Sequence, residues 1–321
     1  MKKKRILEID LIKGIAIILM VFGHLIYFIK PNILSKILFD SIYVFHMPIF
    51  FWISGYLFKP EFIILDKINR ILIPLIFFSI PHIVKHILTF YWSKNMFDNF
   101  LYECVNVLGG GYYWYLSYLL IYYLISRFFC KNLRGCIFII LLILLTVIIS
   151  DIRNYESKIL WCLYNYLFFL GGYICNALYK ENIFYRRISI YKMIGCFLGC
   201  VFLIMCYLKM GNLSIRLIAA YVCIYLVIKI SHIMCILSNY FKKLNKIVNY
   251  ISYLGTISLT IYLLDGYLIS VEEKIWRTFI VNSCISRWCL VFSILYFNIL
   301  VSVILDKCIK KVKGLERIVG N

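Results

Sequence analysis

Three ionisable residues interrupt one long apolar stretch near the start of the chain. They are Asp10, Lys13 and His24. Lys13 and His24 are eleven residues apart, and at about 100° per residue this spacing places them within about 20° of each other on a helix. Asp10 lies about 60° away on the same side. We therefore expect one face of this helix to carry all three groups.

His24 has the side chain of a general base, because an imidazole can remove a proton from a hydroxyl near neutral pH. A rise of about 1.5 Å per residue sets His24 about 16 Å above Lys13, past the middle of a membrane-length helix. Ionisable groups in such helices are costly, which makes them the first candidates for function. A lone histidine is also a common packing residue, so spacing alone leaves both roles open.

A second histidine, His46, lies in the next apolar stretch, two residues before Pro48. Proline kinks a helix and frees backbone groups. We expect His46 to approach the depth of His24, although capping the helix or contacting lipid headgroups would explain it as well. Lys67 and Arg70 precede the third apolar stretch, where the usual role of a cation is to reach toward lipid phosphate.

The composition excludes a water-soluble fold. Of the 321 residues, 63% are hydrophobic and 16% are charged, and the mean hydropathy is +0.88. A typical globular chain has about 45 to 50% apolar and about 25% charged residues. Lipid must be the solvent for most of this chain, and helices satisfy their own backbone in lipid. We predict an all-α polytopic membrane protein that forms one domain over residues 1–321.

Apolar runs of membrane-spanning length recur along the whole sequence. A helix needs about 20 mostly apolar residues to cross a bilayer core. Ten runs meet this expectation, of which the second and fifth are short enough to be half-spans. They cover residues 11–29, 42–58, 71–91, 112–129, 136–150, 159–178, 190–208, 213–237, 247–271 and 288–305.

The basic residues report orientation. The net charge of +20, taken without regard to position, would suggest a nucleic-acid partner. With the N-terminus inside the cell, however, 21 Lys and Arg fall in inside segments and 10 in outside segments. This bias follows the positive-inside rule. We predict a plasma (bacterial inner) membrane protein with both termini in the cytosol and no nucleic-acid partner.

Most tryptophans fall at the predicted outer ends of these spans. An interfacial aromatic belt is the favoured explanation, and a platform on which sugar rings stack is the alternative. The residues concerned are Trp92, Trp114, Trp161, Trp276 and Trp288.

Several motifs together resemble the acyltransferase family 3 of ten-span membrane proteins. Within this family, the chain most resembles the fucose 4-O-acetylase-like and surface-polysaccharide O-acyltransferases. The first two motifs are the most specific. In chain order they read IDLIKGIAIILMVFGH, FHMPIFFWISGYLF, KINRILIPLIFF, YWYLSYLL and LGTISLTIYLLDGYL.

The resemblance implies transfer of an acyl group, often acetyl, from cytosolic acyl-coenzyme A to a glycan or lipid-linked sugar. Lys13 and His24 match the family's basic residue and histidine, with Lys where many members have Arg. Arg70 with Lys67 partly matches a basic pair before the third span. Asp265 stands where many members have a histidine.

On this basis we expect His24 and His46 to be catalytic, with His24 the general base and His46 orienting it, polarising the carbonyl or contacting the acceptor. Acyl-coenzyme A is expected as a donor substrate, with no permanently bound cofactor and no metal. Its phosphates would meet cations at the cytosolic mouth. The donor-binding residues are then Lys13, Lys67 and Arg70.

Substrate contacts are assigned to Asp10, Trp114 and Asp265. Asp265 is expected at the start of a helix interruption at Asp265-Gly266, where it would pair with a cation or bind sugar hydroxyls.

A polysaccharide-precursor transporter or flippase is the alternative function, since it would also be polytopic and carry intramembrane charges. A family relative that has lost catalysis is the third possibility.

Overall fold

The computed structural model describes residues 6–27, 33–60, 64–90, 111, 113–130, 132–153, 155–179, 189–278, 284–312 and 318–319. These residues form eleven α-helices. The helices are α1 (Leu7–Tyr27), α2 (Ile33–Tyr56), α3 (Ile64–Phe90), α5 (Trp114–Phe129), α6 (Leu133–Arg153), α7 (Lys158–Tyr179), α9 (Ile190–Met210), α10 (Leu213–Ser238), α11 (Lys242–Thr256), α12 (Ser258–Thr278) and α13 (Cys284–Lys311).

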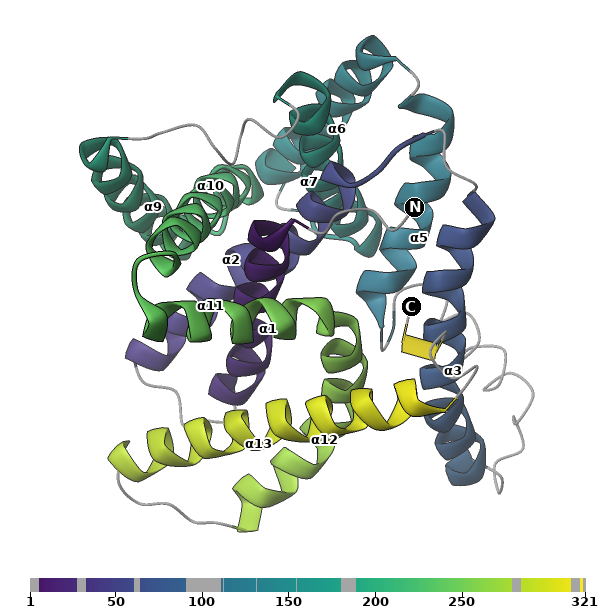
Figure 1. The fold of residues 1–321 in the computed structure, drawn as a ribbon. Helices are drawn as coiled ribbons and strands as arrows, with labels where there is room; N and C mark the ends of the chain where they lie inside the picture. Colours follow the sequence, from purple (N-terminus) through teal and green to yellow (C-terminus); the bar gives the residue numbers. More distant parts are fainter. Residues whose placement is uncertain are drawn as a thin grey trace.

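The outer helices present apolar side chains away from the bundle. Helix α9 lies at the edge of the molecule beside α10 (Figure 1) and buries Cys200 and Ile204, whereas Phe197 and Phe202 are exposed. In water, such a continuous apolar face would favour aggregation. A lipid environment removes that penalty, and the helix satisfies its own backbone hydrogen bonds there.

Seven described helices are long and apolar enough to cross a membrane: α1, α2, α6, α7, α9, α10 and α13. An eighth span results if α11 and α12 are counted together, since the pair passes the same test with a 72° bend. The predicted third and fourth spans correspond to α3 and α5. Helix α5 has 16 residues, and the part of α3 whose side chains the structure describes, Ile68–Val84, is an apolar helix of less than spanning length. The total of ten spans therefore stays a prediction.

Two details of the predicted spans were wrong. The second and fifth are not half-spans, since α2 has 24 residues and α6 has 21. Polar residues among 33–41 had hidden the first turns of α2. The late span is not interrupted at Asp265-Gly266 either, because α12 continues through this pair. Its break lies at Ile257, between α11 and α12.

Helix α1 is the central element of the bundle. It packs against α2, α10, α11, α12 and α13, and α11 crosses it near its N-terminal half (Figure 1). Helix α2 packs in turn against α7 and α10. The two helices that carry the predicted histidines are therefore held on several sides.

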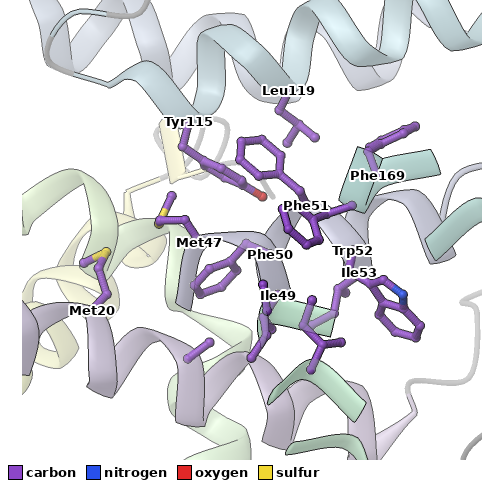
Figure 2. Close-up of a cluster of buried hydrophobic side chains, with 14 of the residues drawn as sticks. Met20, Met47, Ile49, Phe50, Phe51, Trp52, Ile53, Tyr115, Leu119 and Phe169 are labelled. Carbon is purple, nitrogen blue, oxygen red and sulfur yellow. The ribbon is translucent and has the colours of Figure 1, made fainter. Parts of the chain in front are cut away.

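A continuous apolar core fills the space between α1, α2, α5 and α7 (Figure 2). Phe51 of α2 is fully buried, with its ring centroid 4.8 Å from that of Tyr115 and 5.2 Å from that of Tyr122. Aromatic pairs at such distances add to the stabilisation from burial. Met20 and Met47 belong to the same core, so it extends directly to the region of the two histidines.

Glycines allow the central helices to approach backbone to backbone. A Cβ atom on Gly14 of α1 would lie 1.9 Å from the carbonyl oxygen of Ile251 in α11. A Cβ atom on Gly255 would lie 1.8 Å from the carbonyl oxygen of Asp10. Small residues at a crossing are a general device for close helix packing in membranes. They fix α1 against α11 without side chains between them.

Replacing Gly14 by alanine is expected to destabilise the protein by about 1 to 3 kcal/mol, because the added methyl group must push two backbones apart. The matched control is Gly199→Ala in α9, where an added Cβ meets no atom within 4 Å. Thermal unfolding of both purified variants checks the prediction. An unchanged midpoint for Gly14→Ala would show that the crossing is less tight than described.

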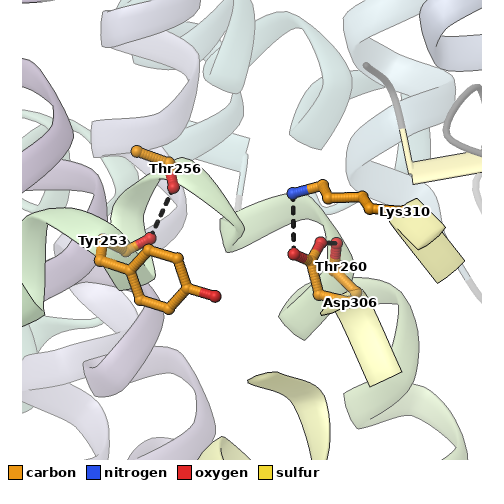
Figure 3. Close-up of polar contacts among 5 residues, drawn as sticks. All are labelled: Tyr253, Thr256, Thr260, Asp306 and Lys310. Carbon is orange, nitrogen blue, oxygen red and sulfur yellow. Dashed lines mark hydrogen bonds and ion pairs between the residues drawn. The ribbon is translucent and has the colours of Figure 1, made fainter. Parts of the chain in front are cut away.

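A buried carboxylate ties α12 to α13. Asp306 is 2% exposed, accepts a hydrogen bond of 2.7 Å from the Thr260 hydroxyl and one of 2.7 Å from the Lys310 ammonium (Figure 3). Pairing and hydrogen bonding are what make such a buried charge tolerable. The contact holds the first turn of α12 in place.

Candidate active site

A cavity of about 300 Å³ lies among six helices, within the size range of small-molecule sites. Its wall combines histidines, cations and a large share of aromatic side chains. The lining residues are Met20, His24, Tyr43, His46, Met47, Pro48, Trp114, Tyr118, Lys158, Trp161, Tyr164, Asn165, Arg216 and Tyr262.

The cavity lies at one end of the helical bundle. It is lined by the C-terminal half of α1, by the first two turns of α5 and α7, and by the first turn of α10. In the predicted orientation all of these are outer ends. The alternating directions of these helices therefore bring their lining residues to a single side.

The most informative contact in the cavity wall joins α1 to α12. The Nδ1 atom of His24 lies 2.6 Å from Oδ2 of Asp265, 241 residues later in the chain. The side chain of Asp265 is 3% exposed and that of His24 is 26% exposed, so the carboxylate is buried behind the imidazole. With Asp265 ionised, Nδ1–H donates to it, which leaves Nε2 as the atom able to accept a proton.

Asp265 is thus placed to orient His24 and to stabilise the imidazolium formed when Nε2 takes a proton. Its other oxygen, Oδ1, is buried and has no hydrogen-bond partner among the described residues. The sequence prediction that Asp265 pairs with a cation or a sugar hydroxyl did not include this pairing with His24.

His46 is placed differently from His24, although both line the cavity. It is 3% exposed, and its Nδ1–H donates to the Ile42 carbonyl oxygen at 2.8 Å. A neutral carbonyl fixes the tautomer but cannot offset a positive charge as a carboxylate does. The Tyr43 ring lies near both histidines, with its centroid 6.2 Å from that of His24 and 4.8 Å from that of His46. The hydrogen bond to Nδ1 of His24 comes from Asp265 and not from His46, whose own Nδ1 is bound to Ile42; orienting His24 was one of the three roles considered for His46.

Arg216 is the main cation in the wall of the cavity. Its Nη2 donates to the Tyr43 carbonyl oxygen at 2.7 Å, and its Nη1 donates to the Tyr207 hydroxyl at 3.2 Å. The guanidinium lies 4.6 Å from the centre of the Trp161 ring. This stack and the hydrogen bonds hold the group in a fixed plane.

The cap of α10 helps to place Arg216. Asp151, near the end of α6, accepts hydrogen bonds from the backbone N–H groups of Leu213 and Ser214 at 2.8 and 2.9 Å. A carboxylate at a helix N-terminus satisfies free N–H groups and complements the helix dipole. Because Arg216 lies within this first turn, the cap fixes the direction from which it enters the cavity.

The tryptophans at the predicted outer ends divide into two groups. Trp114 and Trp161 line the cavity, where their rings are accessible to a ligand. Trp288 packs near Phe22, with ring centroids 6.4 Å apart, and does not line it. Trp92 lies outside the described residues, as does the side chain of Trp276. For two of the five, the alternative of a stacking platform fits their position.

The residues predicted to bind the donor lie away from this cavity. Lys13 is part-buried on α1, eleven residues before His24, and Arg70 is exposed near the start of α3. Asp10 lies where α1 crosses α11, and it does not line the cavity either. The side chain of Lys67 falls outside the described residues. The structure brings together His24, His46, Trp114 and, through His24, Asp265.

Sequence reasoning missed several residues of the cavity wall. Arg216 and Lys158 were counted as outside charges, and Tyr43, Asn165 and Tyr262 were read as part of apolar runs. The only available signal was that Arg216 and Lys158 lie within or next to spans at the same predicted end. Neither residue belongs to a motif that marks it as part of a site.

Apolar helices of spanning length around a largely aromatic cavity that also holds histidines and cations define a multi-pass membrane protein with an internal site. Residues 6–307 match the family model Acyl_transf_3, described as an acyltransferase domain, and the chain belongs to this family. The expected resemblance is thereby confirmed.

Among curated proteins, the chain is similar to the nodulation protein NolL of Sinorhizobium fredii, with 28% identity over 227 residues that cover 65% of this chain and 58% of the relative. It is also similar to the nodulation protein NolL of Mesorhizobium japonicum, with 26% identity over 221 residues that cover 65% and 57%. The chain thus spans less than two thirds of the length of these relatives. No solved structure shows a significant match.

Proposed function

We propose that this protein is a membrane-embedded O-acyltransferase that moves an acyl group, acetyl in the simplest case, from cytosolic acyl-coenzyme A to a hydroxyl of a cell-surface glycan or lipid-linked sugar. The observation that carries the proposal is the His24–Asp265 pair in the wall of an aromatic cavity. Membership of the family supports it.

The reaction requires a base next to the acceptor hydroxyl. Nε2 of His24 takes the hydroxyl proton as the acceptor oxygen attacks the thioester carbonyl carbon. The carbon–sulfur bond then breaks, the ester forms, and the coenzyme A thiolate leaves. The proton held on Nε2 passes to the thiolate sulfur or to solvent, which returns His24 to its neutral form. Asp265 holds the imidazole in the required tautomer throughout.

The donor enters from the opposite end of the bundle. In the proposed orientation the start of α1 and the start of α3 face the cytosol, and both carry cations, Lys13 and Lys67 with Arg70. Phosphate groups of coenzyme A bind there through charge-assisted hydrogen bonds. The pantetheine arm then runs between the helices toward His24 and presents the acyl carbonyl to it. Both termini of the chain lie in the cytosol in this arrangement.

Membranes that contain the protein, incubated with labelled acetyl-coenzyme A and glycan acceptors, test this function. We expect the label to appear in an alkali-labile ester on the glycan and to depend on the protein. Movement of the glycan across the membrane without incorporation of label would instead identify a transporter. The absence of both would identify a relative without catalysis.

Arg70→Ala is expected to raise the KM for acyl-coenzyme A about tenfold, the effect of one lost charge-assisted hydrogen bond to phosphate. The KM for the acceptor should not change, because Arg70 is absent from the wall of the cavity. Initial rates over a range of each substrate measure both constants. The matched control is Arg134→Ala, an exposed cation at the start of α6. A change confined to the acceptor KM would reject this location for the donor.

A further inference from the structure

The guanidinium of Arg216 has hydrogen-bonding capacity that the described part of the protein does not use. A guanidinium carries five N–H groups. One on Nη1 and one on Nη2 donate to Tyr207 and to the Tyr43 carbonyl oxygen. The Nε–H group is buried and has no partner among the described residues. A fixed planar group with spare donors is suited to bind an oxyanion through two parallel hydrogen bonds.

In the described ranges, the charge of Arg216 also has no directly paired carboxylate. Among the described residues no Asp or Glu oxygen forms an ion pair with it. Asp40 influences it only through longer-range electrostatics, and Asp151 is occupied at the start of α10. A part-buried cation gains stability from an anion that replaces its lost hydration. Within the described part of the chain, that place is open to a ligand.

The surroundings of Arg216 indicate what kind of molecule carries the anion. Trp114 supplies a flat apolar face on which a pyranose ring stacks, and Trp161, with Arg216 against its ring, lines the same cavity. The hydroxyls of Tyr164 and Tyr262, two residues of the same wall, are buried and have no hydrogen-bond partner among the described residues, which leaves unsatisfied polar groups beside the cavity. Lys158, exposed at the rim, adds a second positive charge. A ring, several hydroxyls and an anionic group together describe an acidic saccharide.

We propose that the acceptor is an acidic saccharide whose carboxylate or phosphate binds Arg216, with the hydroxyl to be acylated against His24. This inference rests on the proposed function for the direction of transfer, but the binding site itself does not require that function. Arg216 thereby acts as a specificity-determining residue. It selects acceptors by charge and places their ring between the aromatic side chains and the base.

Binding to the purified full-length protein tests the proposal without acyl transfer. The probes are methyl glucuronide, glucose 1-phosphate, the neutral methyl glucoside and inorganic phosphate. We expect either acidic sugar to bind about tenfold to about a hundredfold more tightly than methyl glucoside, the range for a charged hydrogen-bonded pair. The stronger of the two acidic probes identifies whether the anion is a carboxylate or a phosphate. Comparable binding of inorganic phosphate would show a free-anion site and overturn the proposal.

Variants of Arg216 separate recognition from folding. Arg216→Gln should abolish the preference for acidic sugars and leave the affinity for methyl glucoside unchanged. Arg216→Lys keeps the charge but loses the planar pair of donors, so it should retain part of the preference even if the glutamine variant does not fold. The matched control is Arg153→Gln, an exposed residue at the end of α6 outside the cavity, which should behave as the wild type.

The outcomes distinguish this inference from the proposed function. If Arg216→Gln lost its affinity for acidic and neutral sugars equally, Arg216 would have a structural role and the inference would be overturned. Equal affinity of the wild-type protein for all the sugars would also overturn it. A charge preference in binding together with no transfer from labelled acetyl-coenzyme A would keep the inference and reject the acyltransferase. Transfer to neutral and acidic acceptors with the same kcat/KM would support the acyltransferase and reject the inference.

Discussion

Replacing His24 by asparagine is expected to lower the rate of acyl transfer by about 10²- to 10⁴-fold, the usual contribution of a positioned general base. Asparagine is chosen because its amide N–H can still donate to Asp265 and keep the buried carboxylate paired. Alanine would leave that carboxylate alone, and unpaired buried charges are strongly destabilising. The asparagine variant therefore separates loss of chemistry from loss of structure.

The measurement is the initial rate of label transfer from acetyl-coenzyme A at saturating donor, normalised to the amount of folded protein. The matched control is His232→Asn. His232 lies on α10 with its Nδ1 3.9 Å from Glu8, away from the cavity, and its replacement should leave the rate unchanged. Added imidazole should partly restore transfer to His24→Ala, since the vacated space adjoins the cavity. Full activity of His24→Asn would remove His24 from the role of base.

The second large effect is expected for Asp265→Asn, with kcat reduced by about 10²-fold or more and little change in either KM. The amide has nearly the shape of the carboxylate but no charge to stabilise an imidazolium. It also permits the wrong tautomer of His24. Steady-state kinetics of the purified variant check this division between kcat and KM. Asp306→Asn is the matched control, because Asp306 is equally buried but pairs with Thr260 and Lys310.

A double variant decides whether Asp265 acts through His24. When His24 is already asparagine there is no imidazole left to orient, so adding Asp265→Asn should cause no further loss of rate. Additive losses would mean that Asp265 contributes independently, by contacting a substrate or by supporting the fold. The comparison therefore separates a positioning role from a structural one.

The sequence was sufficient to predict the class of fold and to single out His24, one half of the proposed catalytic pair. Long apolar runs predict helices in lipid whatever their tertiary contacts, and His24 is conspicuous because such runs rarely contain a histidine. Local sequence patterns do not predict the residue that pairs with His24. Its partner Asp265 lies 241 residues away, and no periodicity links α1 to α12.

The omission of Arg216 from the site and the misplaced helix break have the same physical origin. Arg216 was counted as one of several outside charges. Its place in the site depends on contacts with Tyr43 and Trp161, which come from other helices. The break at Ile257 was placed at Asp265-Gly266, since a polar residue beside glycine marks a helix interruption in most sequences. Here Asp265 is stabilised by His24, and the helix continues through it.

The bend at Ile257 couples the two ends of α1 mechanically. On one side of the bend, Gly255 of α11 lies against the backbone of Asp10, and on the other, Asp265 of α12 bonds to His24. The bent pair thus clamps α1 at two points separated by 14 residues. Any change in the bend angle must strain one contact or the other. The geometry of the His24–Asp265 pair is therefore set partly by a helix crossing near the opposite end of α1, beyond the reach of either side chain.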